Sequence, residues 1–349
     1  MPTIPAKQLR EIASQLLQSA GASAEEANIV SRHSMAANLA GHDSHGLIAI
    51  PTYIERMKQS HIVPGAPFEV ARETSVTTVI DGHWGFGYVV SERAMQITID
   101  KAKQHGVAAT TVYQQGHVGR VADYPIMAAE ADVVGLMTAD SGRTSKSVAP
   151  FGGREARLGT NPICIAMPSN LEGPLFIDMA TSAVAGGKIS VALARGAQIP
   201  EGWILDKAGD PTTSPADLGQ GGVMLPLGGP EGHKGYGLSV MVEIFSGILT
   251  GLGFGHHPEG RHNDGCFMAA FNVDAFRPID DFKREVTEFA SYLKSCPPAA
   301  GFEEVFYPGE LEYLRTQQKL REGIFIEDTT WSRLKSLAEG YGVAAELGF

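Results

Sequence analysis

Two histidines stand beside glycines in the motifs best suited to chemistry. His45 belongs to the run GHDSHG at 41–46, and His117 belongs to GHVGR at 116–120. Imidazole gains and loses a proton near neutral pH, and neighbouring glycines let the backbone approach a ligand closely. The two histidines therefore indicate a proton-transfer site.

Two other chemistries fit these residues less well. Asp43, Ser44 and His45 are consecutive, so they cannot align three side chains as a catalytic triad, and no GxSxG turn surrounds Ser44. The chain has no HExxH helix for zinc. The remaining histidine cluster is interpreted as surface side chains of a loop, and it comprises His256, His257, Glu259 and His262. We expect no metal site.

Standard nucleotide-binding motifs are missing from the sequence. The run GLGFG at 251–255 follows an expected helix rather than a strand, so it does not fit a Rossmann fingerprint. Asp178 follows an apolar run at 175–177, and its carboxylate could cap a helix or accept hydrogen bonds from a ribose or an amide. Lys234 stands where a helix is expected to begin, as either a solvated charge or a phosphate ligand.

Helices and strands must position these residues. A capping box, SAEE at 23–26, begins a helix that should end near Gly41, and another helix is expected from Ser44 through Met57. A strand at 107–113 ends just before His117. Further strands are expected at 74–81, 133–138, 162–167, 175–177 and 267–273. Further helices are expected at 91–104, 181–195, 234–249, 282–293, 309–320 and 329–338, with an exposed loop at 219–229.

The composition is that of a globular protein of 349 residues. Lys and Arg number 28 against 39 Asp and Glu, a net charge of −11 that disfavours nucleic acid or an anionic membrane as a partner. The three cysteines form no CxxC pair, and neither a secretory leader nor a membrane span is legible. The sequence therefore predicts a cytoplasmic protein.

Seven short motifs, in this order, resemble the type-2 malate/L-lactate dehydrogenase family. They are GHDSHG (41–46), GHVG (116–119), GTNP (159–162), DMATS (178–182), PTT (211–213), HKG (233–235) and PGE (308–310). The longer string AANLAGHDSHG at 36–46 is similar to the hydroxycarboxylate dehydrogenase B branch. Each motif is short, but together they span nearly the whole chain.

This resemblance implies an NAD(P)-dependent oxidoreductase without a Rossmann fold. It also implies an α+β (mixed α/β) architecture, in which a mostly antiparallel sheet binds the cofactor and both chain ends build a helical domain. The implied domains are 1–60 plus 305–349 (helical, contributing to the substrate site and a homodimer), 61–118 (small α/β) and 119–304 (NAD-binding). We expect NAD, with NADP as an alternative, because no arginine-rich pocket for a 2′-phosphate is legible.

The resemblance also assigns roles to residues. His117 and His45 would lie in the catalytic centre, with His117 as the first and His45 as the second candidate to relay the proton. His45 would also contact nicotinamide or substrate, and Ser44 and Tyr53 would contact substrate. Cofactor contacts are expected from His45, Gly119, Arg120, Val121, Phe176, Ile177, Asp178, Met179, Ala180, His233, Asp264, Gly309, Glu310, Leu311 and Glu312. Weaker candidates are Lys234, Ser141 and Thr160.

One position departs from the family pattern and leaves the substrate open. Much of the family carries an arginine that clamps a carboxylate where this chain has Ala49. Arg120, Arg143 or Lys146 could supply the missing cation. The expected substrate is a small 2-hydroxy or 2-oxo acid, and a cyclic imine-2-carboxylate is the alternative. A hydrolase or a binding protein that uses the Asp-Ser-His segment is a more distant alternative.

Overall fold

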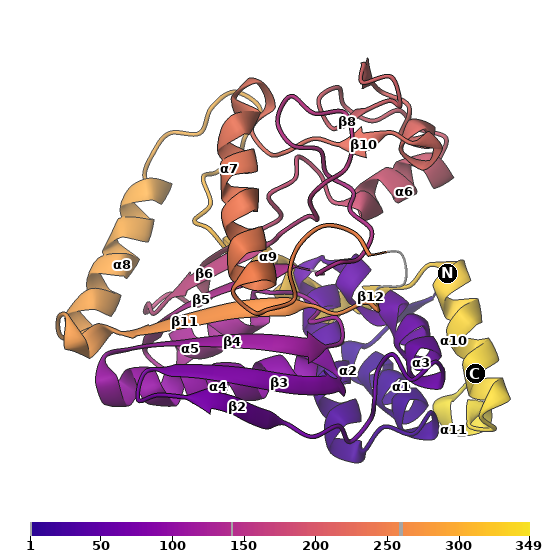
Figure 1. Cartoon of the computed structure of the whole chain (residues 1–349), viewed down its shortest axis with the longest axis horizontal. Coiled ribbons are helices and arrows are strands. Elements are labelled where there is room, and N and C mark those ends of the chain that lie inside the picture. The colour runs from indigo at the N-terminus through magenta and orange to yellow at the C-terminus, as the bar shows by residue number, and fades with distance from the viewer. Residues whose placement is uncertain (1, 141, 258–260) are drawn as a thin grey trace.

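The computed structural model describes residues 2–140, 142–257 and 261–349, and its centre is a seven-stranded sheet (Figure 1). The strand order is β2-β3-β4-β11-β5-β6-β7. Only β3 and β4 are parallel, and the other neighbours are antiparallel. The strands are β2 (Glu69–Glu73), β3 (Thr77–Gly85), β4 (Val107–Gln115), β11 (Gly265–Asn272), β5 (Val133–Asp140), β6 (Ile163–Met167) and β7 (Leu175–Met179). The expected mixed α/β fold with a mostly antiparallel sheet is confirmed.

Two helices cover one face of this sheet. They are α4 (Gly87–His105), which connects the parallel strands, and α5 (Asp123–Glu130) (Figure 1). Residues alternate between buried and less buried along β4, as expected for a strand with one covered face. Met95 and Ile99 of α4 share a fully buried apolar cluster with Ile80 and Val112. This packing fixes the end of β4, where His117 follows.

A helical layer built from both chain ends lies beside the sheet (Figure 1). Its helices are α1 (Ala6–Ser19), α2 (Ala24–Ala40), α3 (Ile50–Lys58), α10 (Asp328–Gly340) and α11 (Ala344–Leu347), and a short β1 (Thr3–Ile4) pairs with β12 (Ile324–Phe325). The capping box of α2 is confirmed, because Glu26 N–H donates to Ser23 Oγ and Ser23 N–H donates to Glu26. The helix ends at Gly41 in the left-handed conformation, also as expected.

The expected helix from Ser44 is wrong in its first turn. The chain instead makes two 3-10 turns, η1 (Asp43–His45) and η2 (Leu47–Ala49), before α3 begins. Asn38 explains the change, because its side chain accepts a hydrogen bond from Leu47 N–H at 2.7 Å and donates to Asp43 at 2.7 Å. Pro51 therefore falls in the first turn of α3, where its missing N–H leaves no bond unmade.

A smaller unit packs above the sheet. It holds a three-stranded sheet of β10 (Val223–Met224), β8 (Ile204–Leu205) and β9 (Pro211–Thr212) beside α6 (Gly186–Ala194) and η3 (Pro215–Gln220). The loop expected at 219–229 is thus wrong at β10, whose residues are buried. Next come η4 (Gly229–Glu231), α7 (Gly232–Glu243) and a π-helical turn, η5 (Ile244–Ile248). Later elements are η6 (Val273–Ala275), α8 (Ile279–Lys294) and α9 (Glu310–Glu322). In the described part of the chain, every helix is too short or too polar to cross a bilayer.

Candidate functional site

A cavity of about 290 Å³ brings the two predicted histidines together. It lies where β4, β5 and β11 meet the 3-10 turn after α2. The imidazole rings of His45 and His117 are stacked with their centres 5.5 Å apart. The other residues that line the cavity are Val118, Gly119, Val121, Ala139, Asp140, Thr144, Ser145, Lys146, Ser147, Gly159, Thr160, Asn161, Pro162, His262 and Asp264.

A string of hydrogen bonds runs from His117 into the helical layer. His117 Nδ1 lies 2.7 Å from the Tyr53 hydroxyl, which lies 3.0 Å from the Tyr88 hydroxyl. Tyr88 in turn donates to the main-chain oxygen of His45 at 3.3 Å. Both tyrosines are buried, and burial raises the pKa of Tyr88 to about 12, so the hydroxyls keep their protons.

The last bond of this string fixes the direction of the others. A carbonyl oxygen only accepts, so the single hydroxyl proton of Tyr88 must be donated to the main-chain oxygen of His45. Tyr53 must then donate to Tyr88, which leaves the Tyr53 oxygen to accept from Nδ1–H of His117. The neutral ring consequently carries its proton on Nδ1, and Nε2 keeps a lone pair for a ligand.

Electrostatics keep His117 neutral. Burial lowers its pKa to about 3, although the carboxylate of Asp264 acts in the opposite direction. Burial also lowers the pKa of His45. Burial would raise the pKa of Asp264, but His262, His117 and the N–H of Val118 together hold it well below its usual range. The cavity thus presents a neutral base beside a fixed negative charge.

The other wall of the cavity is ionic. Lys146 Nζ lies 3.0 Å from a carboxylate oxygen of Asp140 and 3.0 Å from one of Glu243, and all three side chains are almost fully buried. Burial raises the pKa of Asp140 to about 6, against the lowering effect of Lys146. Above that pH, two carboxylates face one ammonium group.

Asn161 supplies an unsatisfied acceptor in this cavity. Its side-chain amide donates to Glu243 at 2.9 Å and to the main-chain oxygen of Ser239 at 3.0 Å. Its backbone is left-handed, with φ of 41°, a conformation that non-glycine residues rarely adopt outside special sites. Its buried Oδ1 has no partner among the described residues. The carboxamide N–H of a nicotinamide would satisfy it, so the residues present fit such a group.

Some predicted cofactor residues line the cavity, and others lie next to it. His45, Gly119, Val121, Asp264 and Thr160 line it. At Gly119, φ is 72° and a Cβ atom would collide with the Tyr88 ring, so only glycine fits there. The adjacent Arg120 is buried, with its guanidinium 5.3 Å from the centre of the Phe176 ring.

Asp178 lies within β7 and begins no helix, so a helix-capping role for it is wrong. Its carboxylate accepts from Ala122 N–H at 3.1 Å and thereby joins β7 to the segment 119–122. Burial raises the pKa of Asp178 to about 6. Met179 and Ala180 follow it, partly exposed.

The predicted segment 309–312 also reaches β7. Phe176 N–H donates to Pro308 at 3.1 Å, and a side chain at Gly309 would collide with Phe176. Glu310 pairs with Lys294, and Glu312 lies 3.8 Å from His42. Ile177 and Leu311 expose their apolar side chains nearby.

The remaining predicted residues lie elsewhere or are not described. His233 and Lys234 are exposed in the first turn of α7, and neither lines the cavity. Tyr53 is within the hydrogen-bond string, and Ser44 is exposed and bonded to His45 at 2.9 Å. Ser141 and Glu259 lie outside the described residues. Within that described portion, no three potential ligands cluster to hold a metal.

Besides Glu243, which pairs with Lys146, sequence reasoning missed four contributors to the site. Tyr88 and Asp140 occupy a helix and a strand end without a local motif. Asn161 lies inside the GTNP motif, whose asparagine could have drawn attention. His262 was assigned to a surface cluster, yet its ring lies 5.9 Å from that of His117, while His256 and His257 are exposed as expected.

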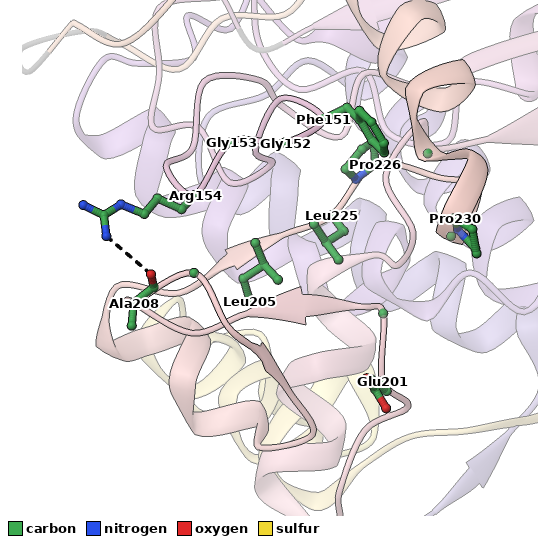
Figure 2. Close-up of a pocket in the computed structure, with 14 residues that line it drawn as sticks. Phe151, Gly152, Gly153, Arg154, Glu201, Leu205, Ala208, Leu225, Pro226 and Pro230 are labelled. Carbon is green, nitrogen blue, oxygen red and sulfur yellow. Dashed lines mark hydrogen bonds between the residues drawn. The ribbon is translucent and has the colours of Figure 1, made fainter.

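A larger cavity of about 770 Å³ lies in the small unit (Figure 2). Its lining is mostly apolar or glycine, with Phe151, Leu205 and Leu225 among the labelled residues. Its charged members are Arg154, which donates to Ala208 at 3.4 Å, and Glu201. No histidine is among the described residues that line it, so the smaller cavity is the better candidate for proton transfer.

Comparison with known proteins identifies the family. The model of the malate/L-lactate dehydrogenase family matches residues 4–335, almost the whole chain. The chain belongs to this family. It is thus a member of the hydroxyacid dehydrogenases, which are oxidoreductases.

Named relatives and solved structures agree with this family. L-sulfolactate dehydrogenase of Methanocaldococcus jannaschii is 37% identical, covering 95% of each chain. Hydroxycarboxylate dehydrogenase B of Escherichia coli K12 is 32% identical, covering 98% of this chain and 95% of its own. The crystal structure of malate dehydrogenase from Entamoeba histolytica superposes with a TM-score of 0.93 at 32% identity, covering 98% of both chains. Δ1-piperideine-2-carboxylate reductase from Pseudomonas syringae superposes with a TM-score of 0.84 at 28% identity, covering 97% of this chain and 100% of its own.

Proposed function

We propose that this protein is an NAD(P)-dependent dehydrogenase that interconverts a small 2-hydroxy acid and its 2-oxo acid. The observation that carries the proposal is the directed string from His117 through Tyr53 and Tyr88 to His45. It leaves a neutral imidazole with a free Nε2 lone pair in the cavity.

The chain's own residues would then handle the proton. Nε2 of His117 accepts the proton of the substrate hydroxyl as the carbon that bears this hydroxyl is oxidised. In the reverse direction, Nε2–H returns the proton to the oxygen. The carboxylate of Asp264 stabilises the imidazolium that forms, while Nδ1–H remains bonded to Tyr53. Bound NAD(P) would supply the hydride acceptor or donor.

Two groups of residues would hold the dinucleotide. Asn161 Oδ1 and the segment 119–121 would bind the nicotinamide end. The remainder would lie along β7 and the start of α9, through Phe176–Ala180 and Gly309–Glu312. We favour NAD over NADP, with NADP retained as the alternative.

Lys146 is our candidate for the cation that binds the substrate carboxylate. Of the three cations considered, Lys146 lines the cavity, whereas Arg143 is exposed and absent from its lining. Arg120 is absent from the cavity lining and instead faces Asp123, 3.5 Å away, and the Phe176 ring. Lys146 could therefore replace the arginine that is missing at Ala49.

We also propose a cytoplasmic homodimer. The three cysteines are free thiols, which suits a reducing compartment. Apolar side chains that are 40–55% exposed gather on α7, on η5 and on the residue that follows η5, where a second copy would cover them. They are Met241, Ile244, Phe245, Ile248 and Leu249. Sedimentation velocity should give a dimer, and a monomer at micromolar concentration would contradict the proposed homodimer.

A substrate panel tests the proposed function. Purified protein is assayed with NADH and with NADPH against lactate-, malate- and sulfolactate-type 2-oxo acids and against cyclic imine-2-carboxylates. We expect NADH oxidation with at least one 2-oxo acid and a smaller rate with every imine. Turnover of imines alone would replace the proposal with the alternative, and no nicotinamide oxidation with any substrate would contradict both.

Imine reduction remains the second candidate because of the ionic wall. Asp140 and Glu243 present two carboxylates against Lys146, which would favour a protonated, cationic imine. A solved imine-2-carboxylate reductase also shares this fold.

A further inference from the structure

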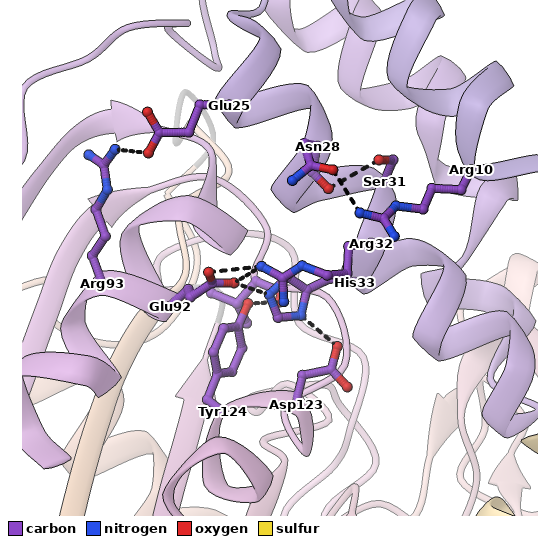
Figure 3. Close-up of polar contacts among 11 residues, drawn as sticks. Arg10, Glu25, Asn28, Ser31, Arg32, His33, Glu92, Arg93, Asp123 and Tyr124 are labelled. Carbon is purple, nitrogen blue, oxygen red and sulfur yellow. Dashed lines mark hydrogen bonds and ion pairs between the residues drawn. The ribbon is translucent and has the colours of Figure 1, made fainter. Parts of the chain in front are cut away.

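His33, in the middle of α2, is held between two carboxylates outside the cavity (Figure 3). Its Nδ1 lies 2.8 Å from Asp123 Oδ2, and its Nε2 lies 2.6 Å from Glu92 Oε2. The ring stacks on Tyr88 at 5.6 Å and lies 5.4 Å from the ring of Tyr124. Only 3% of the residue is exposed, so water cannot substitute for these contacts.

This arrangement decides the charge of the ring. A neutral imidazole has one N–H donor, and an ionised carboxylate only accepts, so a neutral His33 would leave one contact without a proton. The imidazolium donates to both. Burial alone would lower the pKa of His33, but its bonds to Asp123 and Glu92 and their negative charges raise it above the ordinary value. The two short contacts therefore favour the positively charged ring.

The cluster joins three elements of the fold. Glu92, on α4, also receives two bonds from Arg32 at 2.8 and 2.7 Å. Asp123 begins α5, directly after the segment 119–122, which includes the predicted cofactor residues 119–121, and faces Arg120 at 3.5 Å. His33 thus ties the helical layer to the helices that cover the sheet.

Both sides of His33 lead to the candidate site. On one side, Asp123 orients Arg120, which lies over Phe176 of β7. On the other side, Tyr88 packs on the His33 ring and carries the hydrogen-bond string to Tyr53 and His117.

We propose that His33 is a positioning residue whose imidazolium, gripped by Glu92 and Asp123, holds the segment 119–122 and Tyr88 in place for cofactor binding. The reference to a cofactor rests on the proposed function, whereas the charge and contacts of His33 do not.

The proposal has a direction in pH. The groups that contact His33 are Tyr88 and Glu92 from α4 and Asp123 and Tyr124 from α5. Beyond them, Arg32 of the same helix bonds to Glu92, and Arg120 of the loop before α5 faces Asp123. Because the folded-state pKa of His33 is raised, its stabilising effect is complete below the unfolded value of 6.5 and is lost as pH rises through the folded value. Cofactor binding should weaken on the same alkaline side.

The test measures His33 directly and through the cofactor. Its Cε1–H resonance is assigned by comparison with His33→Gln and followed by NMR from pH 5 to about 10. The KM for NADH, kcat and the unfolding temperature are measured over the same range. Glutamine cannot donate to both carboxylates in this geometry, so we expect His33→Gln to raise the KM for NADH about tenfold and flatten its alkaline rise, with kcat kept within about threefold.

His83→Gln is the matched control. His83 also contacts a carboxylate, Glu69, at 2.7 Å, but its side chain is 36% exposed and it does not line the cavity. We expect this variant to leave the KM, the pH profile and the unfolding temperature unchanged.

The outcomes separate this proposal from the proposed function. If wild-type protein oxidises no NADH, the NMR midpoint and the pH dependence of unfolding still decide the charge of His33. A midpoint at or below 6.5, or a His33→Gln variant with wild-type KM and pH profile, overturns the proposal. If His33→Gln does not fold, Glu92→Gln removes one partner at a side chain that is 22% exposed. That variant should lower the His33 midpoint, and an unchanged midpoint also overturns the proposal.

Discussion

His33 and His117 are two enclosed histidines in opposite charge states, and one string of tyrosines links them. His33 faces two carboxylates and is held positive. His117 faces the Tyr53 hydroxyl, and burial lowers its pKa to about 3. Burial acts in the same direction on both rings. The partners therefore decide the charge, so that one ring serves as a fixed cation and the other as a free base.

Replacing His117 should produce the largest change. His117→Gln removes the Nε2 base, so we expect kcat to fall by about 10²–10⁴-fold. NADH affinity, measured by fluorescence quenching, should stay near wild type because His117 contributes to proton transfer rather than to cofactor binding. A variant that keeps near-normal kcat would remove His117 from this role and erase the contrast with His33.

Lys146→Met should affect substrate binding rather than turnover. Loss of a charged hydrogen bond to the substrate carboxylate should raise the KM for the 2-oxo acid by about 10–100-fold. Lys146→Arg should recover much of the affinity, and Arg143→Ala, at an exposed position outside the lining, should change nothing. An unchanged KM in Lys146→Met, checked for folding by circular dichroism, would exclude Lys146 as the clamp.

Tyr53→Phe tests how the tautomer of His117 is set. The variant removes the acceptor of Nδ1–H, so the ring can protonate either nitrogen and only part of the population offers Nε2 as a base. We expect kcat to fall about tenfold, with a smaller change in the KM for NADH. Tyr113→Phe, on β4 but outside the cavity lining, is the control, and equal effects of both variants would contradict the directed string.

The smallest effect should come from pH acting on the ionic wall. The pKa of Asp140 is raised to about 6. Below that pH, the Asp140 carboxyl group is neutral and repels an anionic substrate less than the carboxylate does. The KM for a 2-oxo acid should therefore rise by up to about tenfold as pH increases from 5 to 8. Asp140→Asn should remove this dependence, and a persistent rise in that variant would assign it to another group.

The sequence alone predicted what local patterns encode. The capping box at 23–26 begins α2 as expected, and most strands and helices lie within a few residues of their predicted positions. The two glycine-flanked histidines do meet in one cavity. The turn at 43–49 was missed because it depends on the side chain of Asn38, which overrides the helical pattern.

Long-range partners could not be predicted. Glu92 and Asp123 lie 59 and 90 residues from His33 along the chain, and no motif marks any of the three. Tyr88 is likewise an ordinary residue of α4 until the fold places it against Tyr53. The domain limits and the cofactor contacts stay predictions, since they depend on surfaces and ligands beyond this chain.

Nitrogen-15 NMR of the histidine side chains reports the charge and the tautomer of both rings in one experiment. At pH 7, we expect His117 to be neutral with its proton on Nδ1 and its lone pair on Nε2, and we expect His33 to carry protons on both nitrogens. A His117 ring that is protonated on Nε2, or that titrates near the 6.5 of an ordinary histidine, would contradict this expectation.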